Sequence, residues 1–246
     1  MHARNCCAGG GLCCFLLATC CVSPLAAQQM DMGGLADLLQ GLGGQQGGGG
    51  GGKKKAAICP AEKIAVPKPL KKLKPGTLIA NGCGPQGMVM KEPYGLWRCC
   101  NRHDVCYSSC GASFDFCEKK FKQCTQERCK QPENAGQEAE CMEQANSMLG
   151  LTGIFGKDFH SNSARTVCEC VDSESEAQQR RREWVVDVYE RFGDPVKASN
   201  ETFINSLLEK NRGKEGKLVF DLITKYGGKP GFVQFNDIPN TFELLG

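Results

Sequence analysis

Hydrophobic and polar positions recur with a helical period in the middle of the chain. Residues 96–110 contain no proline and no interior glycine, and they include cysteines at steps of seven and four residues: Cys99, Cys106 and Cys110. This spacing places the cysteines near one face of a helix, and Gly111 follows as a stop signal. The pattern therefore predicts a helix over residues 96–110.

A second helix is predicted directly after the first. Ser113 and Asp115 are suited to cap its first turn. Its hydrophobic positions then recur at steps of three, four and three, with charged residues between them: Phe114, Cys117, Phe121 and Cys124. Cysteines on this face are expected to form disulfides with the neighbouring helix.

The pattern is interrupted after residue 130 and then resumes. Glycines at positions 150, 153 and 156 break up the next segment. From Ser163 there is no breaker before Gly193, which predicts one long helix that carries Cys168 and Cys170 back toward the first helix.

Residues 176–246 lack cysteines and carry two apolar stripes, which predicts a C-terminal helical extension. The stripes consist of Trp184, Val185, Val188, Tyr189 and Phe192, and of Phe203, Ile204, Leu207 and Leu208. They either pack against each other or the core, or bind a membrane or a partner. The extension also contains a potential glycosylation sequon at residues 200–202.

The N-terminal part of the chain has a different composition. Residues 1–27 have the layout of a secretory signal peptide, with cleavage expected after Ala27. A retained membrane anchor is the alternative, but the apolar run is about half of the roughly 20 residues that a spanning helix needs. Residues 28–57 are dominated by glycine, which predicts a flexible linker or propeptide. The chain is therefore expected to be secreted and extracellular.

Cysteine content supports this location. Of the 18 cysteines, six lie in residues 1–27 and twelve follow. An even, clustered set behind a secretory signal is typical of a disulfide framework. Structural zinc is the alternative, but paired C-x2-C knuckles are absent from the sequence, and residues 28–246 hold only His103 and His160. We expect an all-α, disulfide-rich domain over residues 58–175.

Charge adds little to this picture. The formal net charge is +3, with basic runs at residues 53–55, 68–74 and 180–182. Such runs are usually solvated faces or flexible segments. They can also attract anionic lipid surfaces, by about 1 kcal/mol per cation near the surface. No nucleic-acid partner is expected.

Candidate chemistry lies on the first predicted helix, at His103 and Asp104. Adjacent helical positions point about 100° apart, so the two side chains address different groups. An imidazole suits proton abstraction from water, and a carboxylate suits a hard cation such as calcium. The glycine-rich residues 81–87, "NGCGPQG", could turn backbone carbonyls toward that cation. The alternative is a plain turn fixed by a disulfide at Cys83.

One longer string supports the first interpretation. "CCNRHDVCY" at residues 99–107 resembles the C-C-x-x-H-D-x-C-Y helix motif of secreted phospholipase A2. The lead-in "NGCGPQG" and the later cysteines are similar to the group XII branch of that family. The resemblance covers about residues 59–172.

The resemblance implies calcium-dependent cleavage of the sn-2 ester of glycerophospholipids, at a membrane surface or in micelles. It implies two long antiparallel helices, with the calcium-binding loop against the first. His103 would be the catalytic base. The remaining implied positions are calcium ligands at Gly82, Gly84, Gln86 and Asp104, a supporting Tyr107, and disulfides Cys83–Cys100 and Cys106–Cys170.

The chain departs from the family pattern behind the histidine. The family commonly has C-x-C-D in the second helix, and that aspartate orients the histidine, whereas "CECVDSE" places Val171 after Cys170 and Asp172 one position later. Asp172 is the candidate support, with Tyr107 and a water as the alternative. Two other functions remain open: a phospholipase-like lipid-binding protein with little or no catalysis, and a purely structural disulfide module.

Overall fold

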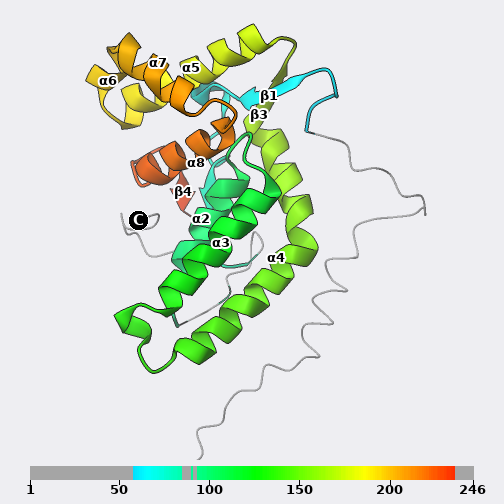
Figure 1. Cartoon of the computed structure of the whole chain (residues 1–246), viewed down its shortest axis with the longest axis vertical. Helices are drawn as coiled ribbons and strands as arrows, with labels where there is room; N and C mark the ends of the chain where they lie inside the picture. The colour runs from blue at the N-terminus through cyan, green and yellow to red at the C-terminus, as the bar shows by residue number, and fades with distance from the viewer. Residues whose placement is uncertain (1–57, 85–89, 91–92, 236–246) are drawn as a thin grey trace, which may run out of the picture. The chain divides into compact units, whose positions relative to one another are not determined.

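The computed structural model describes residues 58–84, 90 and 93–235. The predicted signal peptide, the predicted linker or propeptide at residues 28–57 and Gln86 therefore lie outside the described residues. Within these ranges the protein is mostly helical and disulfide-rich (Figure 1). The elements are β1 (Ile64–Pro67), η1 (Leu70–Lys72), β2 (Ile79–Ala80), α2 (Trp97–Tyr107), α3 (Phe114–Cys129), η2 (Pro132–Asn134), α4 (Glu138–Val167), β3 (Cys168–Val171), α5 (Glu174–Phe192), α6 (Pro195–Ser199), α7 (Glu201–Lys210), α8 (Glu215–Tyr226) and β4 (Gln234–Phe235).

Helices α2 and α3 form the predicted cross-linked pair. Disulfides Cys99–Cys124 and Cys106–Cys117 connect them, so their sequences run in opposite directions. Ser113 caps α3, because its side chain accepts a hydrogen bond from the Phe116 amide at 3.2 Å. Helix α2 ends three residues earlier than predicted, at Tyr107.

Helix α4 contradicts the prediction that glycines break this segment. It is one helix of 30 residues that packs along α3 (Figure 1). Gly150 and Gly153 face open space, so each costs only the roughly 0.5–1 kcal/mol of conformational freedom that glycine loses in a helix. A buried face offsets that cost; its members are Cys141, Ala145, Met148, Gly156, His160, Ala164 and Val167.

The predicted long helix over residues 163–192 is also wrong. The chain leaves α4 at Val167 and forms strand β3, which pairs antiparallel with β1. Two disulfides hold this strand, Cys110–Cys168 and Cys59–Cys170. The expected Cys106–Cys170 bridge is therefore wrong, whereas the expected Cys83–Cys100 bridge is confirmed. Strand pairing and long-range covalent links override the helical pattern here.

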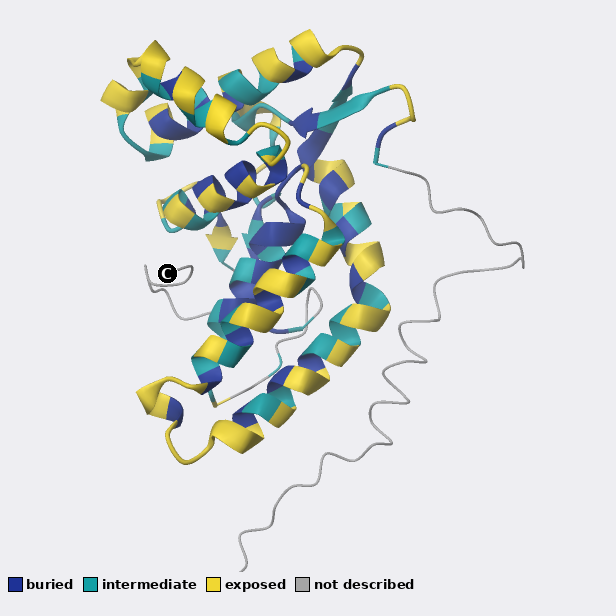
Figure 2. Cartoon of the chain, viewed as in Figure 1, coloured by how far each residue is buried: buried dark blue, intermediate teal, exposed yellow. Residues whose placement is uncertain are grey.

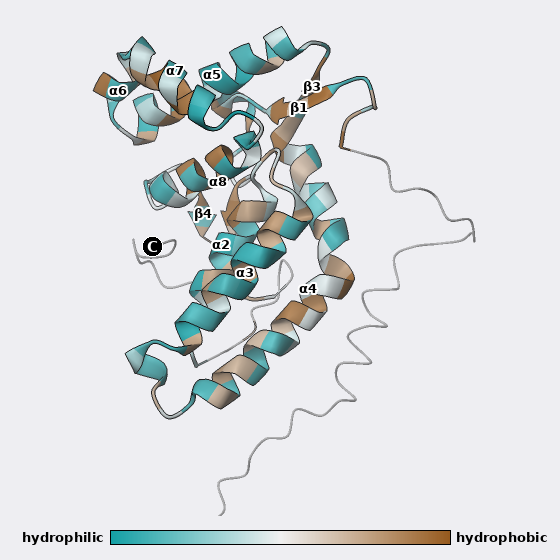
Figure 3. Cartoon of the chain, in the orientation of Figure 1, coloured by the Kyte–Doolittle hydropathy of each residue, from teal (hydrophilic) through white to brown (hydrophobic). Residues whose placement is uncertain are grey.

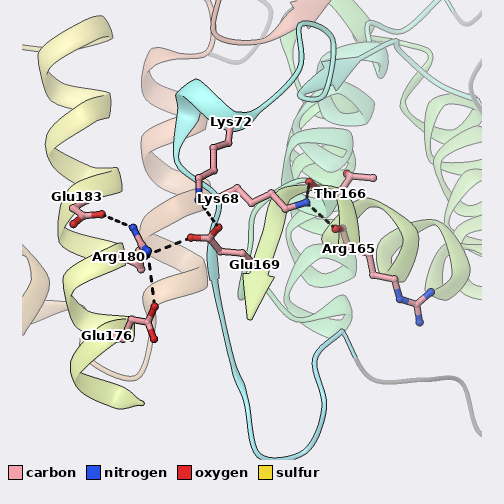
Figure 4. Close-up of polar contacts among 8 residues, drawn as sticks. All are labelled: Lys68, Lys72, Arg165, Thr166, Glu169, Glu176, Arg180 and Glu183. Carbon is pink, nitrogen blue, oxygen red and sulfur yellow. Dashed lines mark hydrogen bonds and ion pairs between the residues drawn. The ribbon is translucent and has the colours of Figure 1, made fainter. Parts of the chain in front are cut away.

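Glu169 of β3 anchors basic residues from two other segments (Figure 4). Its carboxylate lies 3.3 Å from Lys72 Nζ and 3.6 Å from Arg180 Nε. Nearby, Lys68 Nζ donates to the Thr166 carbonyl at 2.7 Å. These contacts show that residues of two basic runs form intramolecular ion pairs and hydrogen bonds.

Residues of the C-terminal extension pack into the core. Buried positions follow α2, α5, α7 and α8 (Figure 2), and they include Val105, Trp184, Val188, Ile204 and Ile223. This confirms the packing alternative for the apolar stripes. Strand β4 then pairs in parallel with β2. The glycine-rich residues 81–87 directly follow β2. No helix in the described ranges is long and apolar enough to cross a membrane.

Candidate active site

Helix α2 presents His103 and Asp104 in two directions, as the sequence predicts. The His103 imidazole faces α3, where its Nε2 lies 2.6 Å from Oε1 of Glu118. The Asp104 carboxylate faces the segment after β2, where its Oδ2 accepts a hydrogen bond from the Asn81 amide at 3.1 Å. The two side chains therefore serve different partners.

Glu118 is the centre of a hydrogen-bond network that joins three helices. Its Oε1 also accepts from the Tyr107 hydroxyl at 2.7 Å, and its Oε2 accepts from the Thr152 hydroxyl of α4 at 2.6 Å. Gly156 leaves room for this arrangement, because a Cβ there would lie 2.3 Å from the Tyr107 oxygen. The carboxylate next to His103 is thus held from α2 and α4 at once.

The network keeps Glu118 ionised and Tyr107 protonated. Burial acts to raise the pKa of Glu118. The hydrogen bond and the charge interaction with His103, followed by the hydrogen bonds from Thr152 and Tyr107, outweigh burial and lower this pKa below its usual value. Burial, and then the hydrogen bond to Glu118, raise the pKa of Tyr107. The phenol is therefore a hydrogen-bond donor to a carboxylate.

This arrangement selects one tautomer of His103. An ionised carboxylate can only accept hydrogen bonds, so the Nε2 that faces Glu118 carries a proton. A neutral imidazole protonated on Nε2 keeps its lone pair on Nδ1. Nδ1 is therefore prepared to accept a proton, and Glu118 would stabilise the resulting imidazolium.

Aromatic rings restrict the position of the imidazole. The Phe121 ring stacks on it with centroids 4.5 Å apart and planes at 21°, and the Tyr107 ring lies 4.2 Å away and tilted. The His103 residue is 7% exposed. Packing and hydrogen bonding thus fix the same orientation of the ring.

The first of the glycine-rich residues 81–87 are linked to α2. The Cys83–Cys100 disulfide connects them covalently, and the Gly82 amide donates to Asn101 Oδ1 at 2.9 Å. Gly82 and Gly84 have φ values of 79° and 122°, which glycine adopts without steric cost. The sequence "NGCG" is therefore fitted to this bend.

The chemistry of Asp104 and the adjacent backbone at Gly82 and Gly84 fits a calcium ion. Burial raises the pKa of Asp104 well above its usual value, and the hydrogen bond from Asn81 opposes the effect only partly. A divalent cation would offset this cost of ionisation, and calcium prefers carboxylate and carbonyl oxygens. No group of three or more acidic, histidine or cysteine ligands occurs in the described ranges. Backbone carbonyls, such as those of Gly82 and Gly84, would have to supply much of the coordination.

The residue behind His103 was missed by the sequence analysis. Asp172, the expected support, lies on the surface with its side chain 77% exposed and pairs with Lys63 at 3.0 Å. The carboxylate beside the imidazole belongs to Glu118 instead. A sequence signal for Glu118 did exist. In the family pattern, the orienting aspartate directly follows the cysteine that is expected to pair with Cys106. In this chain Cys106 pairs with Cys117, and Glu118 directly follows Cys117.

Comparisons with known proteins agree with the motif. The model of the family described as group XII secretory phospholipase A2 precursor matches residues 37–178. The group XIIB secretory phospholipase A2-like protein of Mus musculus is 28% identical over 130 residues, which are 48% of this chain and 65% of the relative. The group XIIA secretory phospholipase A2 of Homo sapiens is 30% identical over 97 residues, which are 37% of this chain and 51% of the relative.

The chain thus spans between half and two thirds of the length of these curated relatives. No solved structure matches. The family match ends at residue 178, within α5, and so leaves helices α6, α7 and α8 outside it. Because the family model covers more than half of the sequence, the chain belongs to the group XII secretory phospholipase A2 family.

Proposed function

We propose that this protein is a secreted, calcium-dependent phospholipase A2 that hydrolyses the sn-2 ester of glycerophospholipids to a fatty acid and a lysophospholipid. One observation carries the proposal. His103 Nε2 lies against an ionised Glu118, while the adjacent Asp104 accepts a hydrogen bond from Asn81, the first of the glycine-rich residues 81–87 that would bind calcium.

The proton chemistry follows from the tautomer of His103. Nδ1 takes a proton from a water molecule as that water attacks the ester carbonyl, and the imidazolium returns the proton to the leaving alkoxide. Glu118 stabilises the charged ring and keeps it oriented. Water is the nucleophile, so no serine or cysteine is needed for an acyl-enzyme intermediate.

Asp104 and the carbonyls of Gly82, Gly84 and Gln86 are the residues that would hold calcium. When bound, calcium supplies positive charge for the oxyanion that develops on the ester. The Gly84 amide would donate to the same oxyanion.

Exposed hydrophobic residues support action at a lipid surface, and the disulfides support a location outside the cell. Ile154 and Phe159 are 72% and 48% exposed on α4, whose middle is rich in hydrophobic residues (Figure 3). The same helix supplies Thr152 to the catalytic network. Six disulfides agree with an oxidising, extracytoplasmic environment.

Fatty-acid release from phosphatidylglycerol vesicles tests the proposal. We expect release that disappears with a calcium chelator and falls by roughly 10²-fold or more in His103→Gln, which lacks the base. Release that persists under both conditions would contradict it. Calcium-dependent binding to vesicles without hydrolysis would instead favour the lipid-binding alternative.

Thr152 should act as a positioning residue. Replacing it with valine keeps its shape but removes one of the hydrogen bonds to Glu118, a loss of about 1.5 kcal/mol for a bond to a charged group. We expect kcat to fall roughly tenfold with little change in KM. Thr152→Ser should restore most of the rate, which a purely structural role of the methyl group would not predict.

A further inference from the structure

A second feature adjoins His103 on the side away from α4. A cleft of about 80 Å³ lies between α2, α3 and α8, and its lining includes Arg102, His103, Lys120, Glu127 and Phe220. Because one water needs roughly 10–15 Å³ by the same measure, the cleft has room for several waters or for a small polyatomic anion. Its volume is suited to a group smaller than an acyl chain.

The disulfide register between α2 and α3 arranges the charges of this cleft. With Cys99 opposite Cys124 and Cys106 opposite Cys117, Lys120 lies level with His103. Arg102 is the next residue on α2. The acidic Glu127 is seven residues from Lys120, which is about 10 Å along the helix. The end of the cleft beside His103 therefore carries two cations and lies about 10 Å along α3 from Glu127. The nearer Glu118 carboxylate does not line the cleft and is engaged by His103, Tyr107 and Thr152.

These two cations lack a counter-ion among the residues that the structure describes. Neither Arg102 nor Lys120 forms an ion pair with any residue that the structure describes. By contrast, Arg180, Arg181 and Arg182 each pair with a glutamate. The half-buried Arg102 and the exposed Lys120 line the same cleft. A guanidinium and an ammonium in this arrangement are suited to a phosphate, since arginine presents a planar fork of donors to such oxyanions.

We propose that this cleft is a phosphate subsite, in which Arg102 and Lys120 bind a phosphate monoester or diester beside His103. The proposal deepens the phospholipase function and rests on it for the identity of the ligand, a lipid head group. A free phosphate compound has the same recognition chemistry, and the experiment below separates the two sources.

Helix α8 gives the subsite its third wall, although it lies outside the family match. Gly216 packs directly on the Gly111 backbone, where an added Cβ would lie 2.0 Å from the Gly111 carbonyl carbon. Further along α8, Phe220 meets Phe116 edge to face at 5.6 Å. These contacts fix Phe220 against the cleft, so the C-terminal extension would shape what binds there.

The test compares two charge-matched double variants of the full chain. Arg102→Gln/Lys120→Gln removes the proposed ligands. Lys119→Gln/Lys122→Gln removes the same charge from exposed positions of α3 that do not line the cleft. Binding of inorganic phosphate is followed by amide NMR shifts, and binding to phosphatidylglycerol and phosphatidylcholine vesicles by sedimentation. All samples contain a calcium chelator, so neither readout requires hydrolysis or calcium.

We expect the wild type and the control pair to bind phosphate, and the Arg102/Lys120 pair to bind it at least tenfold more weakly, as for lost charged hydrogen bonds. A parallel loss of preference for phosphatidylglycerol vesicles would identify a lipid head group, and a loss confined to phosphate would identify a soluble compound. Absence of phosphate shifts in the wild type would overturn the subsite, as would equal weakening by both pairs. Either result would leave the hydrolysis assay to decide the proposed function separately.

Discussion

Replacement of Glu118 by glutamine should lower kcat for phospholipid hydrolysis by roughly 10²- to 10⁴-fold, the range seen when a histidine base loses its carboxylate partner. A neutral amide can donate as well as accept, so it no longer selects the tautomer of His103 that has its lone pair on Nδ1. It also cannot stabilise the imidazolium by charge. KM should change little, because the partly buried Glu118 acts through its contact with the imidazole. Steady-state kinetics on vesicles measures both constants.

Asp172→Asn is the matched control. It removes a carboxylate at the position that the family pattern indicates, but in this structure that side chain is exposed and pairs with Lys63. Its kcat should therefore stay within about twofold of wild type, since exposed ion pairs contribute little. If Asp172→Asn lost activity and Glu118→Gln kept it, the assignment of the orienting residue would be reversed.

Gly216→Ala should lower the free energy of unfolding by about 3 kcal/mol, the upper part of the range for overpacking a tight contact. The added Cβ would lie 2.0–2.2 Å from backbone atoms of Gly111 and Ala112, which cannot rotate away as a side chain would. Helix α8 would have to shift, and the core that it shares with α2 would open. Chemical denaturation with the disulfides intact measures the change.

Gly150→Ala adds the same methyl group to a helix where nothing lies within 4 Å. It should be neutral or stabilising by up to about 1 kcal/mol, because alanine loses less conformational freedom in a helix. Equal stability of both variants would show that α8 does not pack on the Gly111 turn as described.

Local sequence signals predicted the elements that depend on local interactions. The cap at Ser113 and the helical spacing of cysteines around His103 both agree with the structure. In each case the residues that determine the feature lie within one helix, or within one turn beside it.

Features that depend on distant partners could not be obtained in this way. Whether Cys168 continues a helix or begins a strand depends on β1, about a hundred residues earlier. From the sequence alone, Glu118 is indistinguishable from the other charged residues of α3. Its role becomes recognisable only when the disulfide partner of Cys106 is known to be Cys117. Likewise, the uninterrupted α4 depends on its packing against α3 rather than on its glycines.

The function proposed for the His103 site is cleavage of one ester bond of a phospholipid in the presence of calcium. Mass spectrometry of the products from vesicles with different acyl chains at sn-1 and sn-2 tests this most directly. We expect release of the sn-2 fatty acid and accumulation of the matching lysophospholipid, both reduced by roughly 10²-fold or more in His103→Gln. Release of the sn-1 chain, or intact lipid after binding of the protein to calcium-containing vesicles, would contradict it.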